Sequence, residues 1–544
     1  MEYSFDCRST ARSGDRLRPA SRRVSRVALL SVIAGFGLAA APAFAQSAAQ
    51  IQQLQEQIKQ LQTQLDLVKK QQTADEQKVT VSAAQAAQAS AQASQAAAQV
   101  QSDSDLMVKK SPNGGIQVGG VNFKLGGFTE FATIYRSRND TSDVGSDLNG
   151  IPFNNTAKSQ ESELRFSGRQ SRISGLISGD VDADTHLSAW AEADFLGTSD
   201  VSNSRESNSY LLRMRNFYGA LDKDDWGLHI LAGQNWSLIT TNTQGIMPRN
   251  EQIPLTIDAQ YNVGFNWSRN PQIRVVEDFG NGLWGGLSIE SPQAIVGGNN
   301  PNGTAFANGQ TNPNANNAGD ATGLFSTNQF YTDEEYPDVV AKLAYDAPFG
   351  HFEAKGIERI FTDRYNGRNM DAVGGGAGGA ATFHVIPNGG LDFQMSALAG
   401  YGIGRYGSGQ INDVSFGANG QLVPTPEVEA MAGLVGSPWP GTQAYLYAGL
   451  ESVDSTATKG NAGFGAANVV NSGCQVFGGT CNALTHRLEE LQGGVWQDVY
   501  KGSYGRFTVG ASGAIDKKYT FEGVGGAPNT DEIIFMTSVR YYPF

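Results

Sequence analysis

Residues 187–195 read Leu-Ser-Ala-Trp-Ala-Glu-Ala-Asp-Phe. In an extended chain successive side chains point to opposite faces, so Leu187, the three alanines and Phe195 would share one face. Trp190, Glu192 and Asp194 would share the opposite face. The same period of two recurs at residues 339–346 and 506–516. The pattern predicts strands with one apolar and one charged face; a soluble β-sandwich would also alternate, but the charged face favours a water-filled interior.

Alternating stretches of this kind fill residues 121–544, separated by connections of two lengths. Seven connections are tight, at 179–186, 222–227, 279–282, 347–351, 387–390, 437–442 and 501–505. Eight are longer and polar, near 137–160, 197–209, 239–262, 291–336, 362–371, 405–425, 452–485 and 517–531. These connections predict sixteen strands with both chain ends on the side of the short turns. Short turns on one side and long loops on the other are typical of outer-membrane barrels.

The N-terminal segment has the composition of an export signal. Seven arginines precede an apolar run from Val27 to about Ala41, and Ala43-Phe44-Ala45 supplies the small residues of a cleavage site. We therefore expect a signal peptide at residues 1–45 and a mature chain that begins at Gln46. The rest of the sequence has no further apolar run of membrane-helix length.

These features together predict an all-β fold, a sixteen-stranded antiparallel transmembrane β-barrel at residues 111–544. A closed barrel is the β structure that pairs every backbone group inside a bilayer. An exported barrel belongs in the bacterial outer membrane, where its apolar face would contact lipid. The short turns, and with them the N-terminal extension, would then lie in the periplasm.

Residues 46–110 have the pattern of a periplasmic α-helical coiled coil. Apolar residues recur at spacings of three and four, then give way to an alanine tract. The alternative is a single amphipathic helix docked on the barrel, but the polar surroundings of the narrow seam favour self-association. The Ile and Leu positions alone favour a dimer, whereas the barrel favours a homotrimer, which we expect. The seam residues are Ile51, Leu54, Ile58, Leu61, Leu65 and Val68.

Charge and cysteine content restrict the partners. Removing residues 1–45 leaves 33 basic and 50 acidic residues, a net charge of −17, which argues against a nucleic-acid partner. Cys474 and Cys481 are then the remaining thiols. Two cysteines so close together in an exported Gly- and Asn-rich segment predict a disulfide, because that compartment is oxidising. A metal site is the weaker alternative, since no histidine cluster accompanies them.

Three short motifs in this order resemble a known family. A strand at Phe123–Phe128 is followed by Arg-Gln-Ser-Arg-Ile-Ser-Gly at Arg169–Gly175 and by Leu-Ala-Gly-Gln at Leu231–Gln234. With the preceding signal and coil, this layout resembles the DcaP-like trimeric outer-membrane channels. The resemblance implies a sixteen-stranded porin that takes up small anionic solutes such as dicarboxylates, and a periplasmic coil that joins three subunits. The strongly acidic composition weakens the expectation of an anionic solute.

Charged residues on the first four strands are the predicted ion or substrate pathway. Fixed charges in a narrow pore select ions, and arginine suits carboxylates because its planar fork can donate two parallel hydrogen bonds. The alternative is that the carboxylates of the third strand neutralise the arginines on either side as a cross-strand ladder. The two interpretations are compatible if arginines are in excess. The predicted lumen-facing residues are Lys124, Arg165, Arg172, Glu192, Asp194, Arg213 and Arg215.

Two further predictions concern the fourth strand and the third loop. Leu212, Met214 and Tyr218 are expected to point outward to lipid. The segment 238–260 is the candidate to fold inward and narrow the pore, with Arg249 as its selective charge. A plain external loop is the alternative.

An enzyme is not expected. The histidines lie mostly in or beside predicted turns and loops, and none is paired in the sequence with a plausible Ser or Cys nucleophile. The Gly-rich run 374–379 is not followed by Gly-Lys-Ser, so it is no phosphate loop. We therefore predict no catalytic residue, no metal and no cofactor. A general diffusion porin and a structural or adhesive barrel remain as alternatives to an anion channel.

Overall fold

The computed structural model describes residues 48–102, 109–110, 115–197, 202, 207–299, 334–365, 368–458 and 462–543. The predicted signal peptide at residues 1–45 lies outside the described residues. The chain divides into two compact units, Met1–Asp103 and Ser104–Phe544. Within the described ranges, none of the helices combines the length and the apolar character needed to cross a membrane.

The first unit contains one long helix, α1 (Ala48–Ser102). Its sequence is dominated by Gln and Ala and has neither Pro nor Gly, so most positions favour a helix. The described helix ends at Ser102, and Lys109–Lys110, which the prediction included in the coil, form a strand. Along the helix Leu61 and Leu65 are 64% and 56% exposed. These two residues of the predicted seam are thus unburied in the described structure, and self-association stays a prediction.

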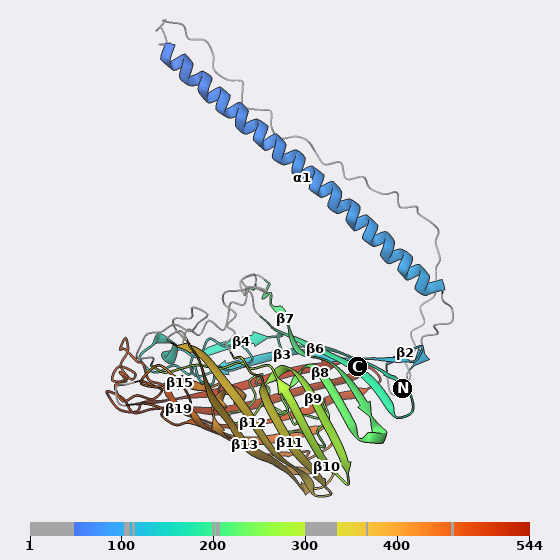
Figure 1. Cartoon of the computed structure of the whole chain (residues 1–544), viewed down its shortest axis with the longest axis vertical. Helices are drawn as coiled ribbons and strands as arrows, with labels where there is room; N and C mark the ends of the chain where they lie inside the picture. Colours follow the sequence, from blue (N-terminus) through green and yellow to red (C-terminus); the bar gives the residue numbers. More distant parts are fainter. Residues whose placement is uncertain are drawn as a thin grey trace, which may run out of the picture. The chain divides into compact units, whose positions relative to one another are not determined.

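The second unit is built around one large antiparallel sheet (Figure 1). It also contains three short 3-10 helices, η1 (Ala157–Gln160), η2 (Asp224–Trp226) and η3 (Gly404–Tyr406). Its strands are β1 (Lys109–Lys110), β2 (Ile116–Val118), β3 (Val121–Arg136), β4 (Glu163–Ser167), β5 (Arg172–Asp180), β6 (Thr185–Gly197), β7 (Leu211–Lys223), β8 (Leu228–Trp236), β9 (Arg269–Gly280), β10 (Leu283–Glu290), β11 (Asp338–Ala347), β12 (Gly350–Tyr365), β13 (Arg368–Ile386), β14 (Leu391–Tyr401), β15 (Val414–Phe416), β16 (Leu422–Pro424), β17 (Pro426–Gly436), β18 (Thr442–Val453), β19 (Thr485–Gly502), β20 (Gly505–Thr520) and β21 (Asn529–Tyr542).

The sheet closes on itself as a barrel. Each wall strand from β3 to β21 pairs with its neighbour, and β21 pairs with β3, for example Val539 with Phe131. β4 and β5 both pair with β3 and form one interrupted wall strand, which brings the wall to sixteen strands. β1 and β2 form a small hairpin on β3, and β15 and β16 pair separately. The predicted strand number and the alternation of short turns with long loops are confirmed.

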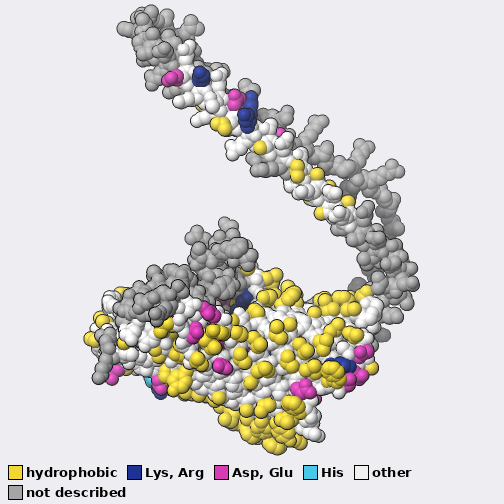
Figure 2. Space-filling view, in the orientation of Figure 1, with side chains coloured by type: hydrophobic (Ala, Val, Ile, Leu, Met, Phe, Trp, Pro, Cys, Tyr) yellow, Lys and Arg dark blue, Asp and Glu magenta, His cyan; other side chains and the backbone are white. Residues whose placement is uncertain are grey.

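The two faces of the wall differ as the alternation predicts. Large apolar side chains such as Leu125, Ile173 and Ile273 are exposed on the outer surface, where Figure 2 shows them gathered over the barrel strands. Charged side chains of the same strands, such as Glu130 and Arg274, are buried on the inner face. In the interrupted strand the inward positions change from odd in β4 to even in β5, so the alternation is broken between residues 167 and 172.

The interior is occupied by the segment 237–268, which we call the inward segment. Its Ile257 and Phe265 pack against Tyr447 of β18 on the wall. Its Leu238 and Ile246 pack against a different part of the wall, at β9, β11 and β12. Of the two alternatives left open by the sequence, the structure therefore has the inward fold, and the apolar core of this barrel lies partly in its lumen.

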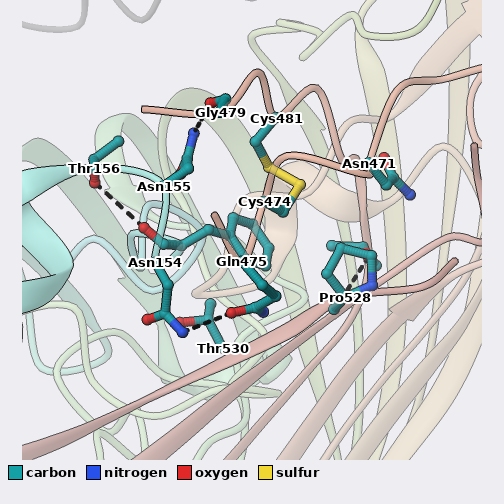
Figure 3. The surroundings of a disulfide bond; sticks show 12 residues. Asn154, Asn155, Thr156, Asn471, Cys474, Gln475, Gly479, Cys481, Pro528 and Thr530 are labelled. Carbon is teal, nitrogen blue, oxygen red and sulfur yellow. Dashed lines mark hydrogen bonds between the residues drawn. A yellow bond between two sulfur atoms is a disulfide. The ribbon is translucent and has the colours of Figure 1, made fainter. Parts of the chain in front are cut away.

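On the long-loop side a disulfide joins Cys474 and Cys481 (Figure 3). The loop that it closes contacts the first long loop: the Asn155 N–H donates to the Cys474 carbonyl at 3.0 Å, and the Gly478 N–H donates to the Asn155 carbonyl at 2.9 Å. Asn154 donates to the Gln475 side chain. The disulfide thus holds a short surface loop in the shape that docks on residues 154–155.

Replacing both cysteines, Cys474→Ser with Cys481→Ser, should leave the barrel folded, because no wall strand includes either residue. The loop 454–484 should become more sensitive to protease, since loop tips without covalent closure are preferred cleavage sites. Limited proteolysis of the folded protein, with cleavage sites read by mass spectrometry, tests this. An unchanged cleavage pattern would show that the docking contacts suffice without the disulfide.

Candidate functional site

Carboxylates of the wall hold the inward segment by its backbone. Glu490 of β19 accepts the Val263 N–H at 2.7 Å, and Glu451 of β18 accepts the Gly264 N–H at 2.7 Å. Because a carboxylate accepts a stronger hydrogen bond than a neutral oxygen, these contacts fix the segment firmly. The same role is taken by Glu290 for Leu238, Glu353 for Asn242, Asp346 for Gly245 and Glu429 for the Asn266 side chain.

Basic and aromatic groups of the wall bind carbonyls of the same segment. The Lys342 and Lys355 ammonium groups donate to the Thr240 and Ile239 carbonyls at 2.6 and 2.9 Å. The Trp496 indole N–H donates to the Leu255 carbonyl at 2.7 Å. Contacts thus reach the inward segment from strands far apart around the wall.

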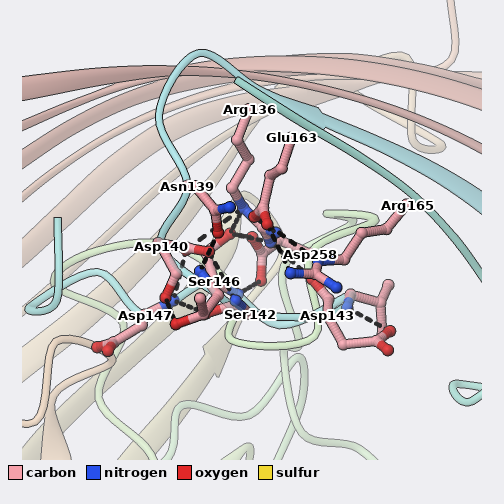
Figure 4. Close-up of polar contacts among 12 residues, drawn as sticks. Arg136, Asn139, Asp140, Ser142, Asp143, Ser146, Asp147, Glu163, Arg165 and Asp258 are labelled. Carbon is pink, nitrogen blue, oxygen red and sulfur yellow. Dashed lines mark hydrogen bonds and ion pairs between the residues drawn. The ribbon is translucent and has the colours of Figure 1, made fainter. Parts of the chain in front are cut away.

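A buried ionic cluster ties the inward segment to the first long loop (Figure 4). Arg136 of β3 binds Glu163 at 2.9 Å and donates to the Ser146 hydroxyl at 2.8 Å. The Ser146 N–H in turn donates to Asp258 of the inward segment at 3.1 Å. Burial raises the pKa of the Asp258 carboxyl above its ordinary value, although Arg136 and Ser146 act to lower it.

Predicted pathway residues on β5, β6 and β7 form one ion-pair network. Asp194 accepts two hydrogen bonds from Arg213, at 3.0 and 2.8 Å, and one from Arg215 at 2.9 Å. Glu192 binds Arg215 at 2.6 Å and Arg172 at 3.5 Å. The cross-strand ladder considered from the sequence is therefore present, with three arginines on two carboxylates.

A β-bulge in β7 reverses one sequence prediction. Glu192 pairs with Asn216 and Ala193 pairs with Met214, so Arg215 is an extra residue between them. Beyond such a bulge the inward positions shift by one. The prediction that Tyr218 faces lipid is therefore wrong: Tyr218 is 3% exposed and lies inside, whereas Met214 is exposed as expected.

A cavity of about 950 Å³ lies at the short-turn end of the lumen, next to residues 437–442; we call it the turn-side cavity. Aromatic rings contribute to its wall, and Arg540 lies 4.5 Å from the Trp496 ring centre. Cationic side chains outnumber carboxylates. The cations are Arg172, Lys501, Arg506 and Arg540, and the carboxylates are Glu192 and Asp498.

A second cavity of about 290 Å³ lies where the inward segment enters β9; we call it the loop-side cavity. It has three cationic side chains and no carboxylate in its lining. The lining residues are Arg213, Met214, Gln234, Trp267, Ser268, Arg269, Arg405 and Gln410.

Aromatic residues of the inward segment lie between the cavities. Tyr261 lines the turn-side cavity and packs edge-on against Trp267, which lines the loop-side cavity, with ring centres 5.1 Å apart. The φ of Tyr261 is 71°, a conformation that a bulky residue adopts only when its surroundings enforce it. Burial raises the pKa of its phenol, but the charges of Arg215, Arg269 and Arg172 outweigh burial and lower the pKa below its ordinary value.

The other predicted residues lie apart from these cavities. Lys124 shares the inward parity of β3 and is exposed. Arg165 binds Glu163 at 2.8 Å and does not line either cavity. Arg249 is exposed on the inward segment, where it donates to the Tyr218 hydroxyl at 3.4 Å and lies over the Trp190 ring.

Five cationic residues of the cavities were missed from the sequence, and one of them, Lys501, falls in a predicted tight turn. Arg506 and Arg540 have the inward parity of β20 and β21, so alternation could have identified them. Arg269 and Arg405 adjoin long loops, where alternation gives no signal. Within the part of the chain that the structure describes, no three His, Cys, Asp or Glu side chains are grouped so as to hold a metal ion.

No protein-family model matches the sequence. No curated protein matches it either. Among solved structures, the chain is similar to the outer membrane channel DcaP of Acinetobacter baumannii, with a TM-score of 0.55 and 16% identity over 80% of this chain and 99% of that chain. Weaker likenesses, with TM-scores of 0.41 and 0.42, are to an anion-selective porin from Comamonas acidovorans (12% identity) and to OmpT of Vibrio cholerae (10% identity), each over 78% of this chain and 99% of the other. The resemblance to DcaP drawn from the sequence is thus confirmed for the fold.

Replacing Asp194 with asparagine should destabilise the barrel, because Asp194 is fully buried and binds two arginines. Breaking a buried ion pair costs about 3–5 kcal/mol, and the amide cannot compensate both guanidinium groups. In gels of samples heated to increasing temperatures, the band of the folded barrel should convert to that of the unfolded chain at a lower temperature than in the wild type.

Asp392→Asn is the matched control, because Asp392 pairs with the half-exposed His384 beside a short turn. Such pairs are worth about 0–1 kcal/mol, so its band should convert close to the wild-type temperature. Equal effects of both substitutions would show that the Asp194 network has no special stabilising role.

Proposed function

We propose that this protein is an outer-membrane channel for passive diffusion of small hydrophilic solutes, with a preference for small anions such as dicarboxylates. One observation carries the proposal: both cavities have an excess of cationic side chains, although the chain as a whole is acidic. Several inner-wall carboxylates accept backbone N–H groups of the inward segment or of the buried segment 402–425, so their charge is partly compensated there. The arginines are left as the dominant charge beside open space.

The arginines also follow one another across the lumen. Arg215 is close enough to Arg172 and to Arg269 for their charges to interact, and Arg269 interacts likewise with Arg213. Arg172 lines the turn-side cavity, whereas Arg269 and Arg213 line the loop-side cavity. In the proposed passage these guanidinium groups would offer an anion successive sites between the two cavities, and closely spaced sites allow both selectivity and conduction.

The proposal extends to location and assembly. Residues 1–45 would direct export, the apolar outer face would contact membrane lipid, and three chains would associate through the barrel and the periplasmic coil at 46–110. The exposed leucines of α1 support this assembly, because burial against partner helices would stabilise each by about 1.5–3 kcal/mol.

Single-channel recording in planar bilayers, with reversal potentials measured in a salt gradient, tests the proposal. An anion-selective current reduced by added succinate is expected. A non-selective current would favour a general diffusion porin, and a folded barrel that conducts no ions would favour the adhesive alternative.

Replacing Arg172 and Arg506 with glutamine should shift the reversal potential toward cations. Both face the turn-side cavity, and their ion pairs are long, at 3.5 Å to Glu192 and 3.7 Å to Asp498, so the barrel should tolerate the change. A charge about 4 Å from a passing ion is worth about 1–4 kcal/mol, depending on hydration. Arg487→Gln, which lies outside both cavities, is the control. Equal reversal potentials in the wild type, the double variant and the control would show that other residues set the ion selectivity.

Replacing Leu61 and Leu65 with glutamine should lower the temperature at which the oligomer dissociates, because both lie on the proposed seam. Leu67 is 61% exposed on the same turns of α1 but lies off the seam, so Leu67→Gln should have no effect. Unheated gels and light scattering in detergent measure the oligomer. If the seam and off-seam variants dissociate alike, the helix does not form the proposed coil.

A further inference from the structure

The three arginines of the loop-side cavity differ in how their charges are compensated. Arg213 is held in place by two hydrogen bonds to Asp194. Arg405 donates to the Asn270 side chain at 2.7 Å and lies 3.8 Å from Asp338. Arg269 has no carboxylate within ion-pair distance among the described residues, and its buried Nη1 has no hydrogen-bond partner.

Aromatic faces hold the Arg269 guanidinium instead of a carboxylate. It lies 4.9 Å from the ring centre of Trp236 and 5.2 Å from that of Trp267. Cation–π contacts offset part of the loss of hydration but provide no acceptor for the N–H donors. A buried donor without an acceptor costs about 1–3 kcal/mol, more when it is charged, so an acceptor from outside the chain would be stabilised at this place.

The cavity fits a small ligand. A volume of about 290 Å³ corresponds to roughly ten water molecules at about 30 Å³ each, enough for one carboxylate, sulfate or phosphate group with some of its hydration. The Gln234 Nε2 group donates to the Met214 and Arg215 carbonyls, and among the described residues no hydrogen bond joins the Gln234 amide oxygen to Arg269. No carboxylate is in the lining, since Asp194 and Asp338 lie behind Arg213 and Arg405, so an anion in the cavity faces cations.

We propose that the loop-side cavity is a binding site for one compact oxyanion. Arg269 would be the principal hydrogen-bond donor to the anion, and Arg213 and Arg405 would be second and third cations that are already held in place. This inference rests on the proposed anion passage, and the cavity would be a saturable binding site along the path of the anion. Two fixed arginines and one unpaired arginine give a site that is already charged before the ligand arrives, so binding requires little rearrangement. Planar forks favour a carboxylate, sulfate or phosphate over a spherical chloride.

Intrinsic tryptophan fluorescence can report occupancy, because Trp236 and Trp267 contact Arg269 directly. The folded full-length protein in detergent is titrated with sulfate, and separately with succinate, against chloride at constant ionic strength. A saturable change with sulfate and succinate, absent with chloride, is expected. Trp267→Phe should remove much of the signal and so identify the reporter.

Arg269→Met should weaken sulfate binding by at least about tenfold, since it removes the principal donor but keeps an apolar stem between the rings. Arg269→Lys keeps the charge without the fork and should bind with intermediate affinity. Arg487→Met removes a charge outside both cavities and should bind as the wild type does. Heated and unheated gels confirm that each variant is folded; if the methionine variant is not, the lysine variant decides.

The binding and conductance results test the anion site and the proposed channel function independently. Wild-type affinity in the Arg269 variants, or no saturable binding by the wild type, would overturn the site, and an anion-selective reversal potential would then leave the proposed function standing. Saturable binding that is lost in Arg269→Met, in a wild-type channel without anion selectivity, would support the site and overturn the proposed function.

Discussion

Hydrogen bonds from the inward segment to wall carboxylates are the contacts on which the interior of this barrel depends. A loop folded into a lumen brings backbone N–H groups that have no strand to pair with, and burying them without acceptors would cost free energy. Glu451 and Glu490 accept such groups from consecutive residues, Gly264 and Val263, and Glu427 does the same for Gly404 in the segment 402–425. Both inward-folded segments, and hence both cavities, take their shape from these carboxylates.

This arrangement explains how an acidic chain can have cationic cavities. The net charge of the sequence counts every carboxylate equally, but Glu427, Glu451 and Glu490 of the wall bind backbone N–H groups, whereas Arg506 and Arg540 stand beside open volume. Composition therefore does not indicate the charge of the cavities, because it cannot distinguish charges that hold the structure from charges that face the lumen. The contacts of individual residues make that distinction.

The strands were predictable because their signal is local. Alternation over eight to eleven residues identified β6, β11 and β20, and turn residues fixed the strand number, since both follow from the geometry of an extended chain. Parity also placed Arg172, Arg213 and the carboxylates of β6 inside. It failed at Tyr218, because a bulge at Arg215 adds a residue without any local signature.

The rest of the site depends on contacts between segments far apart in the sequence. Arg269 follows the inward segment directly, and Arg405 lies in a loop more than a hundred residues later, so no periodic pattern connects them. They meet because Trp267 donates its backbone N–H to the Tyr406 carbonyl at 2.7 Å and its indole N–H to the Ser408 hydroxyl at 3.0 Å. Those bonds dock the segment 402–425 on the inward segment, which is itself held by the wall. A change in the wall carboxylates would therefore act on the loop-side cavity through two docked segments, although the described structure places none of those carboxylates in its lining.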